Sequence, residues 1–245
     1  MTAAGSVSAG SPASTGKEPS PPAPPHRQRR NIIWYTCQLL LQVVFTFWLR
    51  YRCRGIENLP ADGPALLLIN HQSFLDPLLV GLPLDRPVSF LARDSLFRIP
   101  VVGTILRLTY VVPIDRSAAS TRSIRTLTSR LDAGWMTGIF PEGTRSEDGQ
   151  VGPLKPGFVA IVRRTGAPLI PVGIAGANRA MPRSSRGIRR ETVRVVIGEA
   201  LPDELKTEYC RKGREREFAE LVRQRIVACQ LEAEQWCQDG NPAVS

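Results

Sequence analysis

The stretch from residue 55 to about residue 200 alternates short apolar runs with segments whose apolar positions follow a helical period. Six apolar runs predict strands, at residues 65–69, 88–92, 110–114, 137–140, 169–174 and 192–197. Helical patterns lie between them, from residue 94 to about 109 with a break at Pro100, at 117–134 and at 157–164. Strands and helices that alternate at this spacing predict an α/β fold with a largely parallel central sheet flanked by helices.

Residues 203–238 follow a different pattern, in which a single apolar stripe recurs at helical spacing among charged positions. The stripe consists of Phe218, Val222, Ile226, Cys229, Ala233 and Trp236. We expect one long helix or two short ones here, forming a C-terminal amphipathic segment that packs on a domain spanning residues 55–202.

The N-terminal region divides into a polar tail and an apolar segment. Residues 1–26 are rich in Pro, Ser and Ala and too poor in apolar side chains to offset the entropy of ordering, so they predict a disordered tail. Residues 31–49 carry no charge and have three arginines close by on either side. We expect residues 31–50 to form a hydrophobic helix that associates with a membrane, spanning it or lying in one leaflet. The alternative is a helix buried in the protein core.

Composition and charge narrow the class of protein. The chain has 245 residues, 42% of them hydrophobic, which suffices for one domain or at most two small ones. Its five cysteines, without any C-x-x-C spacing, exclude a disulfide-rich miniprotein. The net charge of +10 comes from 28 arginines and only 4 lysines, and it favours partners that carry phosphate: anionic lipids, phosphorylated metabolites or nucleic acid.

Candidate catalytic residues follow the apolar run at 65–69. Asn70 and His71 come directly after this run, and Asp76 lies five residues beyond His71. Ligands bind at the carboxyl ends of strands in α/β folds, so His71 would reach a substrate there. A carboxylate on the far ring nitrogen fixes the tautomer and stabilises the imidazolium, which makes His71 a candidate general base oriented by Asp76. The alternative is a surface histidine beside an unrelated aspartate.

A second polar loop follows the run at 137–140 and reads Phe140-Pro-Glu-Gly-Thr-Arg-Ser146. A free backbone N–H at Gly143, the Thr144 hydroxyl and the Arg145 guanidinium are the kinds of donor that hold a phosphate group. The loop therefore predicts a phosphate cradle, although taken alone it also fits an ordinary turn.

Together these motifs resemble those of the 1-acylglycerol-3-phosphate acyltransferase family of glycerolipid synthesis. The resemblance covers about residues 55–200 and rests on His71-x-x-x-x-Asp76 and on the loop from Phe140 to Ser146. Two weaker blocks lie in the family's order, Val112-Pro-Ile-Asp-Arg116 and Leu169-Ile-Pro-Val-Gly173. Where the family usually has an aromatic or aliphatic pair before Ile-Asp-Arg, this chain has Val112 and Pro113.

The resemblance implies a role for each matching residue. His71 would deprotonate the acceptor hydroxyl while Asp76 orients it, and the oxygen would attack an acyl thioester without forming a covalent acyl-enzyme. The residues implied to hold the acceptor phosphate are Arg116, Gly143, Thr144 and Arg145, with Glu142 shaping the loop or bonding a substrate hydroxyl. Asn70, Arg93 and Lys155 would support this site, and no metal is expected.

The implied reaction moves a fatty acyl group from acyl-CoA or acyl-carrier protein to 1-acyl-glycerol-3-phosphate and yields phosphatidic acid. No cofactor besides the acyl donor is expected. Lyso-ornithine lipid and other lysolipids are alternative acceptors. We expect membrane lipids rather than nucleic acid as partners, and a location on the cytoplasmic face of a bacterial inner membrane. The sequence does not determine the donor, the chain length or the oligomeric state.

Other functions remain as alternatives. Six arginines between residues 179 and 194 suit an anionic membrane or the phosphates of a carrier cofactor, and they equally fit a solvated loop. A non-catalytic basic protein that binds a membrane or nucleic acid would explain the charge, but the chain is only 7% aromatic and contains no nucleic-acid motif that we recognise. A serine hydrolase is disfavoured because no G-x-S-x-G sequence is present.

Overall fold

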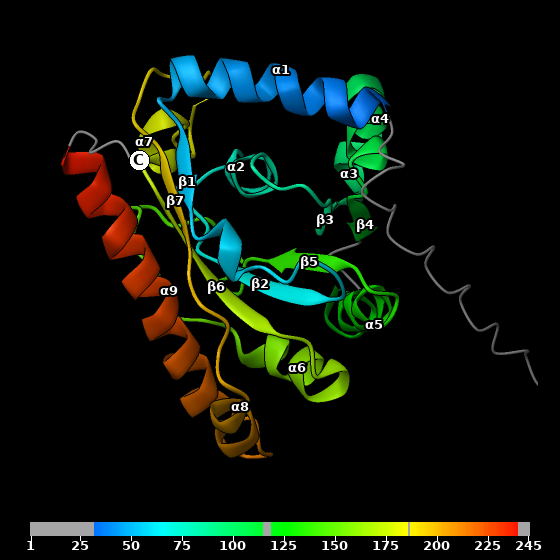
Figure 1. Cartoon of the computed structure of the whole chain (residues 1–245). Helices are drawn as coiled ribbons and strands as arrows, with labels where there is room; N and C mark the ends of the chain where they lie inside the picture. The colour runs from blue at the N-terminus through cyan, green and yellow to red at the C-terminus, as the bar shows by residue number, and fades with distance from the viewer. Residues whose placement is uncertain (1–31, 115–118, 186, 240–245) are drawn as a thin grey trace, which may run out of the picture.

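The computed structural model describes residues 32–114, 119–185 and 187–239, which form one seven-stranded sheet with helices on both faces (Figure 1). Across the sheet the strands are β1 (Arg52–Arg54), β7 (Arg194–Ile197), β6 (Leu169–Ala175), β2 (Ala65–Ile69), β5 (Met136–Ile139), β3 (Val88–Arg93) and β4 (Val112–Ile114). Neighbouring strands are parallel, except that β6 and β7 are antiparallel. The predicted α/β fold with a largely parallel sheet is confirmed.

All six predicted runs form strands, and their ends agree with the predicted ranges within two residues. The hydrophobic pattern does not predict β1, because its three residues, Arg-Cys-Arg, contain a single apolar position. This strand pairs with β7 at the sheet edge, where backbone groups are available. At the opposite edge, β4 forms in spite of Pro113, which lies in register with Ala92. Proline is tolerated there because an edge strand needs no donor on its open side.

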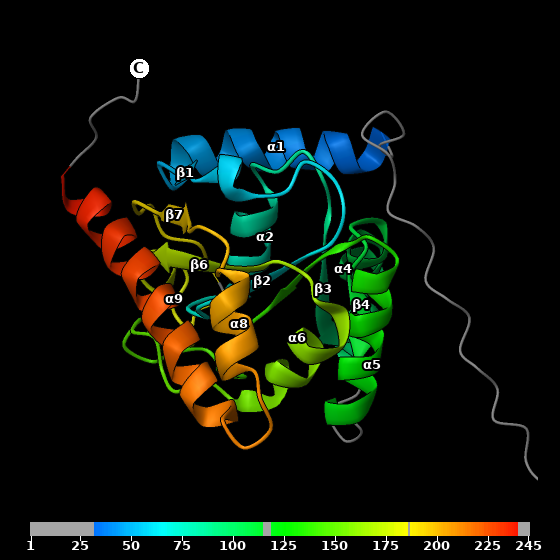
Figure 2. The ribbon, with the colours of Figure 1, turned by 60° about the horizontal axis from the view of Figure 1, so that its bottom comes forward.

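The central strand β2 divides the core into two layers. Its residues are buried on both faces, with Ala65, Leu67 and Ile69 in one apolar cluster and Leu66 and Leu68 in the other. Helices α1 (Ile32–Trp48) and α2 (Asp76–Gly81) cover the first face, and α5 (Ala119–Asp132), α6 (Val159–Thr165) and α9 (Glu215–Gln238) cover the second (Figures 1 and 2). Continuous apolar runs such as β2 are typical of strands covered on both sides.

Shorter helices join these layers. The predicted break at Pro100 is confirmed, because it separates α3 (Asp94–Phe97) from α4 (Pro100–Leu108). Helix α6 ends at Gly166, whose φ of +60° is a left-handed conformation that favours glycine. The remaining short helices are α7 (Ala177–Ala180) and the 3-10 turns η2 (Ile56–Asn58) and η3 (Pro156–Phe158).

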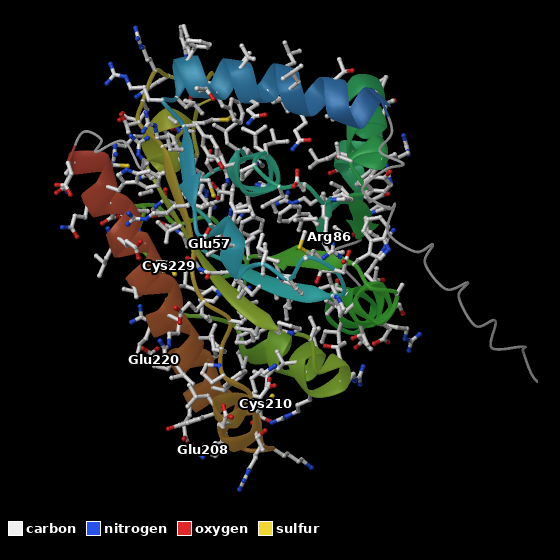
Figure 3. The ribbon with its side chains drawn as sticks, in the orientation of Figure 1. Glu57, Arg86, Glu208, Cys210, Glu220 and Cys229 are labelled. Atoms are coloured by element: carbon white, nitrogen blue, oxygen red, sulfur yellow. The ribbon has the colours of Figure 1, made fainter. Side chains whose placement is uncertain are left out.

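The C-terminal segment consists of one short helix, α8 (Asp203–Tyr209), and the long helix α9. Every residue of the predicted apolar stripe is buried against the sheet. Cys229 lies at this interface (Figure 3), with its Sγ 3.9 Å from the carbonyl oxygen of Pro171 on β6. Gly173 allows the close approach, since a Cβ there would lie 2.2 Å from the backbone nitrogen of Gln230.

Helix α1 matches the apolar segment expected at residues 31–50. Phe45 and Leu49 are buried in the core, whereas Leu40 and Phe47 are 64% and 76% exposed, so the helix presents an apolar face outward. Within the described part of the chain, no helix combines the length and the apolar character needed to cross a membrane. Association with a membrane stays a prediction. The tail predicted at residues 1–26 lies outside the described residues.

Candidate active site

The site lies where β2 ends. Asn70, the first residue after the strand, is buried, and its side-chain amide exchanges two hydrogen bonds with the backbone of Ile174 on β6, at 3.0 and 2.7 Å. With these two bonds, the Asn70 side chain takes the place of a backbone partner and continues the pairing of β2 with β6 past the end of β2. The supporting role expected for Asn70 therefore has a structural basis, because Asn70 fixes the backbone from which His71 projects.

His71 and Asp76 are in direct contact. Nδ1 of His71 lies 2.8 Å from Oδ2 of Asp76, the first residue of α2. The same oxygen accepts the backbone N–H groups of Gln72 and Ser73, each at 2.7 Å. A carboxylate oxygen only accepts hydrogen bonds, so its contact with Nδ1 is a hydrogen bond only if Nδ1 carries the imidazole proton. Nε2 then has a free lone pair. No hydrogen bond to Nε2 is found among the described residues, so this nitrogen is available to a substrate.

Burial perturbs the carboxyl group of Asp76, which is fully enclosed. Desolvation raises its pKa above the ordinary aspartate value, and the hydrogen bonds from His71, Ser73 and Gln72 oppose that rise. The side chain of His71 is 20% exposed. The carboxylate of the pair is therefore shielded from water while the imidazole is accessible, an arrangement that suits general-base chemistry.

Phe140 holds the plane of the imidazole. Its ring stacks on that of His71 with centroids 4.1 Å apart and an angle of 23° between the planes. Phe90 on β3 lies 6.0 Å beyond Phe140 in a second stacked contact. The sequence motif contains Phe140, but neither the spacing nor the resemblance assigned it a role, because the contact depends on β5 lying beside β2.

Glu142 joins the loop after β5 to the end of β2. It is buried, with Oε1 accepting the N–H of His71 at 2.8 Å and Oε2 accepting the N–H of Gly152 at 3.0 Å. The carbonyl of His71 in turn accepts the N–H of Ser146 at 2.7 Å. Desolvation raises the pKa of Glu142, against the effect of the two backbone donors. Of the two roles considered for Glu142, these bonds favour shaping the loop.

One expectation for this loop is wrong. The N–H of Gly143 is not free for a phosphate, because it closes a turn by donating to the carbonyl of Phe140 at 3.0 Å. Gly143 has φ +73°, and a Cβ there would lie 2.7 Å from Nζ of Lys155. Glycine is therefore needed both for the turn and to let the Lys155 ammonium lie across it. The Thr144 side chain beside it is exposed.

Arg145 points its guanidinium over the ring of Phe74, with Cζ 3.8 Å from the ring centroid. Its Nη1 is buried and makes no hydrogen bond within the described part of the chain. The pKa of Arg145 is lowered by desolvation and by the positive charges of Arg183 and Arg93, while Asp76 raises it. These four charged groups therefore lie near one another, and the site combines the His71–Asp76 pair with a cluster of cations and a guanidinium donor that makes no hydrogen bond within the described residues.

The other predicted residues are placed as follows. Arg93 is the exposed last residue of β3 and lies in register with Ile114, the last residue of β4. Arg116, two residues further on, lies outside the described residues. Sequence reasoning missed Gln72 and Gln230, whose side-chain amides both donate to the carbonyl of Gly149 at 2.6 Å. Gln72 falls within the histidine motif, but no pattern in the sequence singles out Gln230.

Comparison with known proteins identifies the family of the chain. A family model described as Acyltransferase matches residues 50–175. The chain is 34% identical over 175 residues to a chloroplast 1-acyl-sn-glycerol-3-phosphate acyltransferase from Brassica napus, covering 70% of this chain and 51% of that one. It is 29% identical over 192 residues to the 1-acyl-sn-glycerol-3-phosphate acyltransferase of Bacillus subtilis, covering 78% and 93%.

The chain spans about half the length of the plant relatives it matches, with 51% of the Brassica protein and 54% of an Arabidopsis thaliana protein covered. A crystal structure of the 1-acyl-sn-glycerophosphate acyltransferase from Thermotoga maritima has the same fold, with a TM-score of 0.64 at 28% identity. That alignment covers 83% of this chain and 82% of the other. The region that the family model matches contains six of the seven strands, all but β7, and the loops that hold His71 and Arg145.

Proposed function

This chain belongs to the acyltransferase family, and from that premise we propose that it acylates the free hydroxyl of 1-acyl-glycerol-3-phosphate to give phosphatidic acid. The acyl group comes from an acyl thioester. The observation that carries the proposal is the contact of 2.8 Å between His71 and Asp76, beside a loop that binds the His71 backbone and bears Arg145. The proposed base and the cation proposed to bind the phosphate therefore lie on segments that are hydrogen-bonded to each other.

In the proposed reaction Nε2 of His71 takes the proton of the acceptor hydroxyl as its oxygen attacks the thioester carbonyl. Asp76 stabilises the imidazolium through the bond to Nδ1. The tetrahedral intermediate collapses with loss of the thiolate, which recovers the proton from His71. An ester forms, a thioester breaks, and the enzyme returns to its starting state. General-base catalysis of this kind contributes about 10²–10⁴ in rate.

The acceptor phosphate is proposed to bind at the cation cluster. Arg145 supplies the buried Nη1 that makes no hydrogen bond within the described residues, and Lys155 lies across Gly143 on the same loop. Thr144 adds an exposed hydroxyl, Arg93 adds charge from β3, and Arg116 completes the set by family resemblance. Each charge-assisted bond contributes about 1.5–3 kcal/mol. The arrangement therefore favours acceptors with a phosphate over neutral alcohols.

The donor and the membrane contact complete the proposal. Acyl-CoA and acyl-carrier protein both carry the phosphate that a basic surface recognises, and neither requires a metal or another cofactor. The outward apolar face of α1, which includes Leu40 and Phe47, is proposed to bind the membrane that contains the lysolipid. We place the protein on the cytoplasmic face of the membrane, where acyl thioesters are available.

The test is an acyl-transfer assay with the purified full-length chain. Labelled acyl-CoA and acyl-carrier protein are each offered with a panel of acceptors: lysophosphatidic acid, lyso-ornithine lipid, lysophosphatidylcholine and monoacylglycerol. We expect labelled phosphatidic acid from lysophosphatidic acid and none from the His71→Ala variant. Preference for lyso-ornithine lipid would mean that this lipid, and not lysophosphatidic acid, is the acceptor. The absence of product with every donor and acceptor would overturn the enzyme assignment.

A further inference from the structure

A second cluster of cations lines a cleft of about 400 Å³ that shares no residue with the site around His71. The residues that line the cleft lie at or just beyond the C-terminal ends of α1 and α9 and along the β1–β7 edge of the sheet. Figure 1 shows how these elements are arranged. The residues that line it are Thr46, Arg50, Tyr51, Arg52, Thr192, Arg194 and Cys237. Three of them are arginines, and no aspartate or glutamate is among the lining residues.

Arg194 is the buried member of this cluster, with only 4% of its surface exposed. Its Nη1 donates to the carbonyls of Arg50 and Val193, and its guanidinium lies 5.0 Å from the ring of Trp236. Its Nε is buried and makes no hydrogen bond with the residues that the structure describes. A buried guanidinium with an unused donor is costly unless an acceptor reaches it, and the cleft is the open space beside it.

Arg52 adds a second charge on the same side of the sheet. It lies in register with Arg194 on the neighbouring parallel strand, so the two side chains leave the same face. The pKa of Arg194 is lowered by burial and further by the charge of Arg52. Arg54, two residues along β1, has its own partner in Glu232, 2.5 Å away. The carboxylate of Glu232 is therefore already engaged with Arg54.

The backbone groups at the ends of the helices near the cleft carry only partial charges. The C-terminal ends of α1 and α9 lie beside the cleft and carry partial negative charge, and Arg194 donates to the carbonyl of Arg50, two residues beyond α1. The lining itself holds three guanidinium groups and no carboxylate, so it favours an anion. The exposed Arg50 side chain makes no hydrogen bond or ion pair within the described residues, so it is free to turn toward an anion.

We propose that this cleft is a binding site for a phosphate group, held by Arg194, Arg50 and Arg52 with the hydroxyls of Thr46 and Thr192. A tetrahedral anion with two negative charges suits a lining that has three guanidinium groups and no carboxylate. The volume exceeds that of free phosphate, and the neighbouring end of α1 has an outward apolar face. The phosphate therefore belongs either to an anionic lipid headgroup or to a soluble ligand. This site rests on no part of the proposed acyl transfer.

The test uses Trp236 as a reporter, because its ring contacts the guanidinium groups of Arg194 and Arg54. The full-length chain is labelled with ¹⁵N in detergent micelles and titrated with inorganic phosphate, with chloride at equal ionic strength as the reference. All proteins carry Arg145→Gln, which removes the phosphate contact proposed for the acyl acceptor. We expect the indole N–H resonance of Trp236 to shift with phosphate while that of the buried Trp135 stays in place.

Two variants locate the effect. Arg50→Gln removes an exposed side chain and should raise the dissociation constant for phosphate at least tenfold, and Arg194→Lys should do the same by removing Nε. Arg125→Gln, an exposed change on α5, is the matched control and should leave the titration unchanged. If Arg194→Lys does not fold, Arg50→Gln decides alone.

Nanodiscs separate the two sources of phosphate. A Trp236 shift in nanodiscs of phosphatidic acid, absent in phosphatidylcholine and in Arg50→Gln, identifies a lipid headgroup. A shift with inorganic phosphate but not with the lipid identifies a soluble ligand. The site is disproved if Trp236 responds to neither, if chloride produces the same shift, or if Arg50→Gln and Arg125→Gln behave alike.

Discussion

Gln72, next to the proposed base, and Gln230, in the middle of α9, donate their side-chain amides to the same carbonyl oxygen of Gly149, each at 2.6 Å. Both glutamines are buried. Gly149 belongs to the loop that begins at Glu142 and that receives the His71 backbone. The C-terminal helix therefore braces the candidate active site from the other face of the sheet.

We expect Gln230→Leu to lower the rate of acyl transfer, because it removes the hydrogen bond between α9 and the loop of the candidate active site. The change leaves the Gly149 carbonyl with one donor, and Glu234 loses its bond of 2.8 Å to the same amide. The free energy of unfolding should fall by about 1–3 kcal/mol, and the maximal rate should fall while the protein stays folded. The exposed Gln235→Leu in the same helix is the control for both measurements. A rate unchanged at equal folded fraction would contradict the positioning role.

Asp76→Asn tests the orientation of His71. An amide oxygen in the place of Oδ2 can still accept the N–H groups of Gln72 and Ser73, but the neutral amide cannot stabilise the imidazolium. A flipped amide would donate its N–H₂ to Nδ1 and favour the wrong imidazole tautomer. The maximal rate of acyl transfer should drop by about 10²–10⁴ with little change in the Michaelis constant for the acceptor. Asp132→Asn, exposed at the end of α5, should leave both constants unchanged. A large rise in the Michaelis constant alone would assign Asp76 to binding instead.

Arg145→Gln tests the phosphate contact. Loss of a charge-assisted bond of about 1.5–3 kcal/mol should lower the acceptor specificity constant for lysophosphatidic acid roughly 10- to 150-fold. Turnover of monoacylglycerol, which has no phosphate, should change little. Phe74→Leu keeps the charge but removes the ring on which the guanidinium rests, so we expect a smaller loss in the same direction. Equal losses with both acceptors in Arg145→Gln would show that the loop supports catalysis without binding the phosphate.

The sequence predicts contacts within one motif better than contacts between distant segments. His71 and Asp76 are five residues apart, and their pairing follows from local spacing. The bond between His71 and Glu142 joins residues 71 positions apart, and that between Gln230 and Gly149 spans 81, so both depend on how the strands are ordered. The free N–H expected at Gly143 was wrong for a local reason, because the turn consumes that donor.

The same distinction holds for the fold. Buried strands such as β2 are continuous apolar runs and are visible in the sequence. The three-residue strand β1 carries two arginines and exists because β7 offers it an edge, which no local pattern reports. Stacking of Phe140 on His71 likewise requires β5 to lie beside β2.

Phe47→Asp tests membrane binding by α1. Phe47 is 76% exposed, so the substitution places a charge on the outward apolar face without opening a cavity in the core. We expect the fraction of protein that sediments with liposomes containing phosphatidic acid to fall severalfold, while the thermal unfolding midpoint stays within about 2 °C. Thr121→Asp adds the same charge at an exposed position of α5 and is the control. If both variants sediment equally, α1 does not contact the membrane.

Glu142 makes the stability of the protein depend on pH in a defined direction. Its pKa is raised by burial, so the folded state holds this proton more tightly than the unfolded state does. At a pH below the ordinary glutamate value of about 4.3 the group is protonated in both states and contributes no difference. As pH rises from there through the raised pKa of the folded state, stability is lost, because the unfolded chain ionises first.

Glu142→Gln cannot ionise and supplies the comparison. The variant leaves either the N–H of His71 or that of Gly152 without an acceptor, so it should be less stable at every pH. The advantage of the wild-type protein should be largest near pH 4 and should shrink as pH rises toward 7. Urea unfolding of both proteins between these values measures it. An advantage that grows with pH would mean that the two backbone donors outweigh desolvation and that the pKa of Glu142 is lowered in the folded protein.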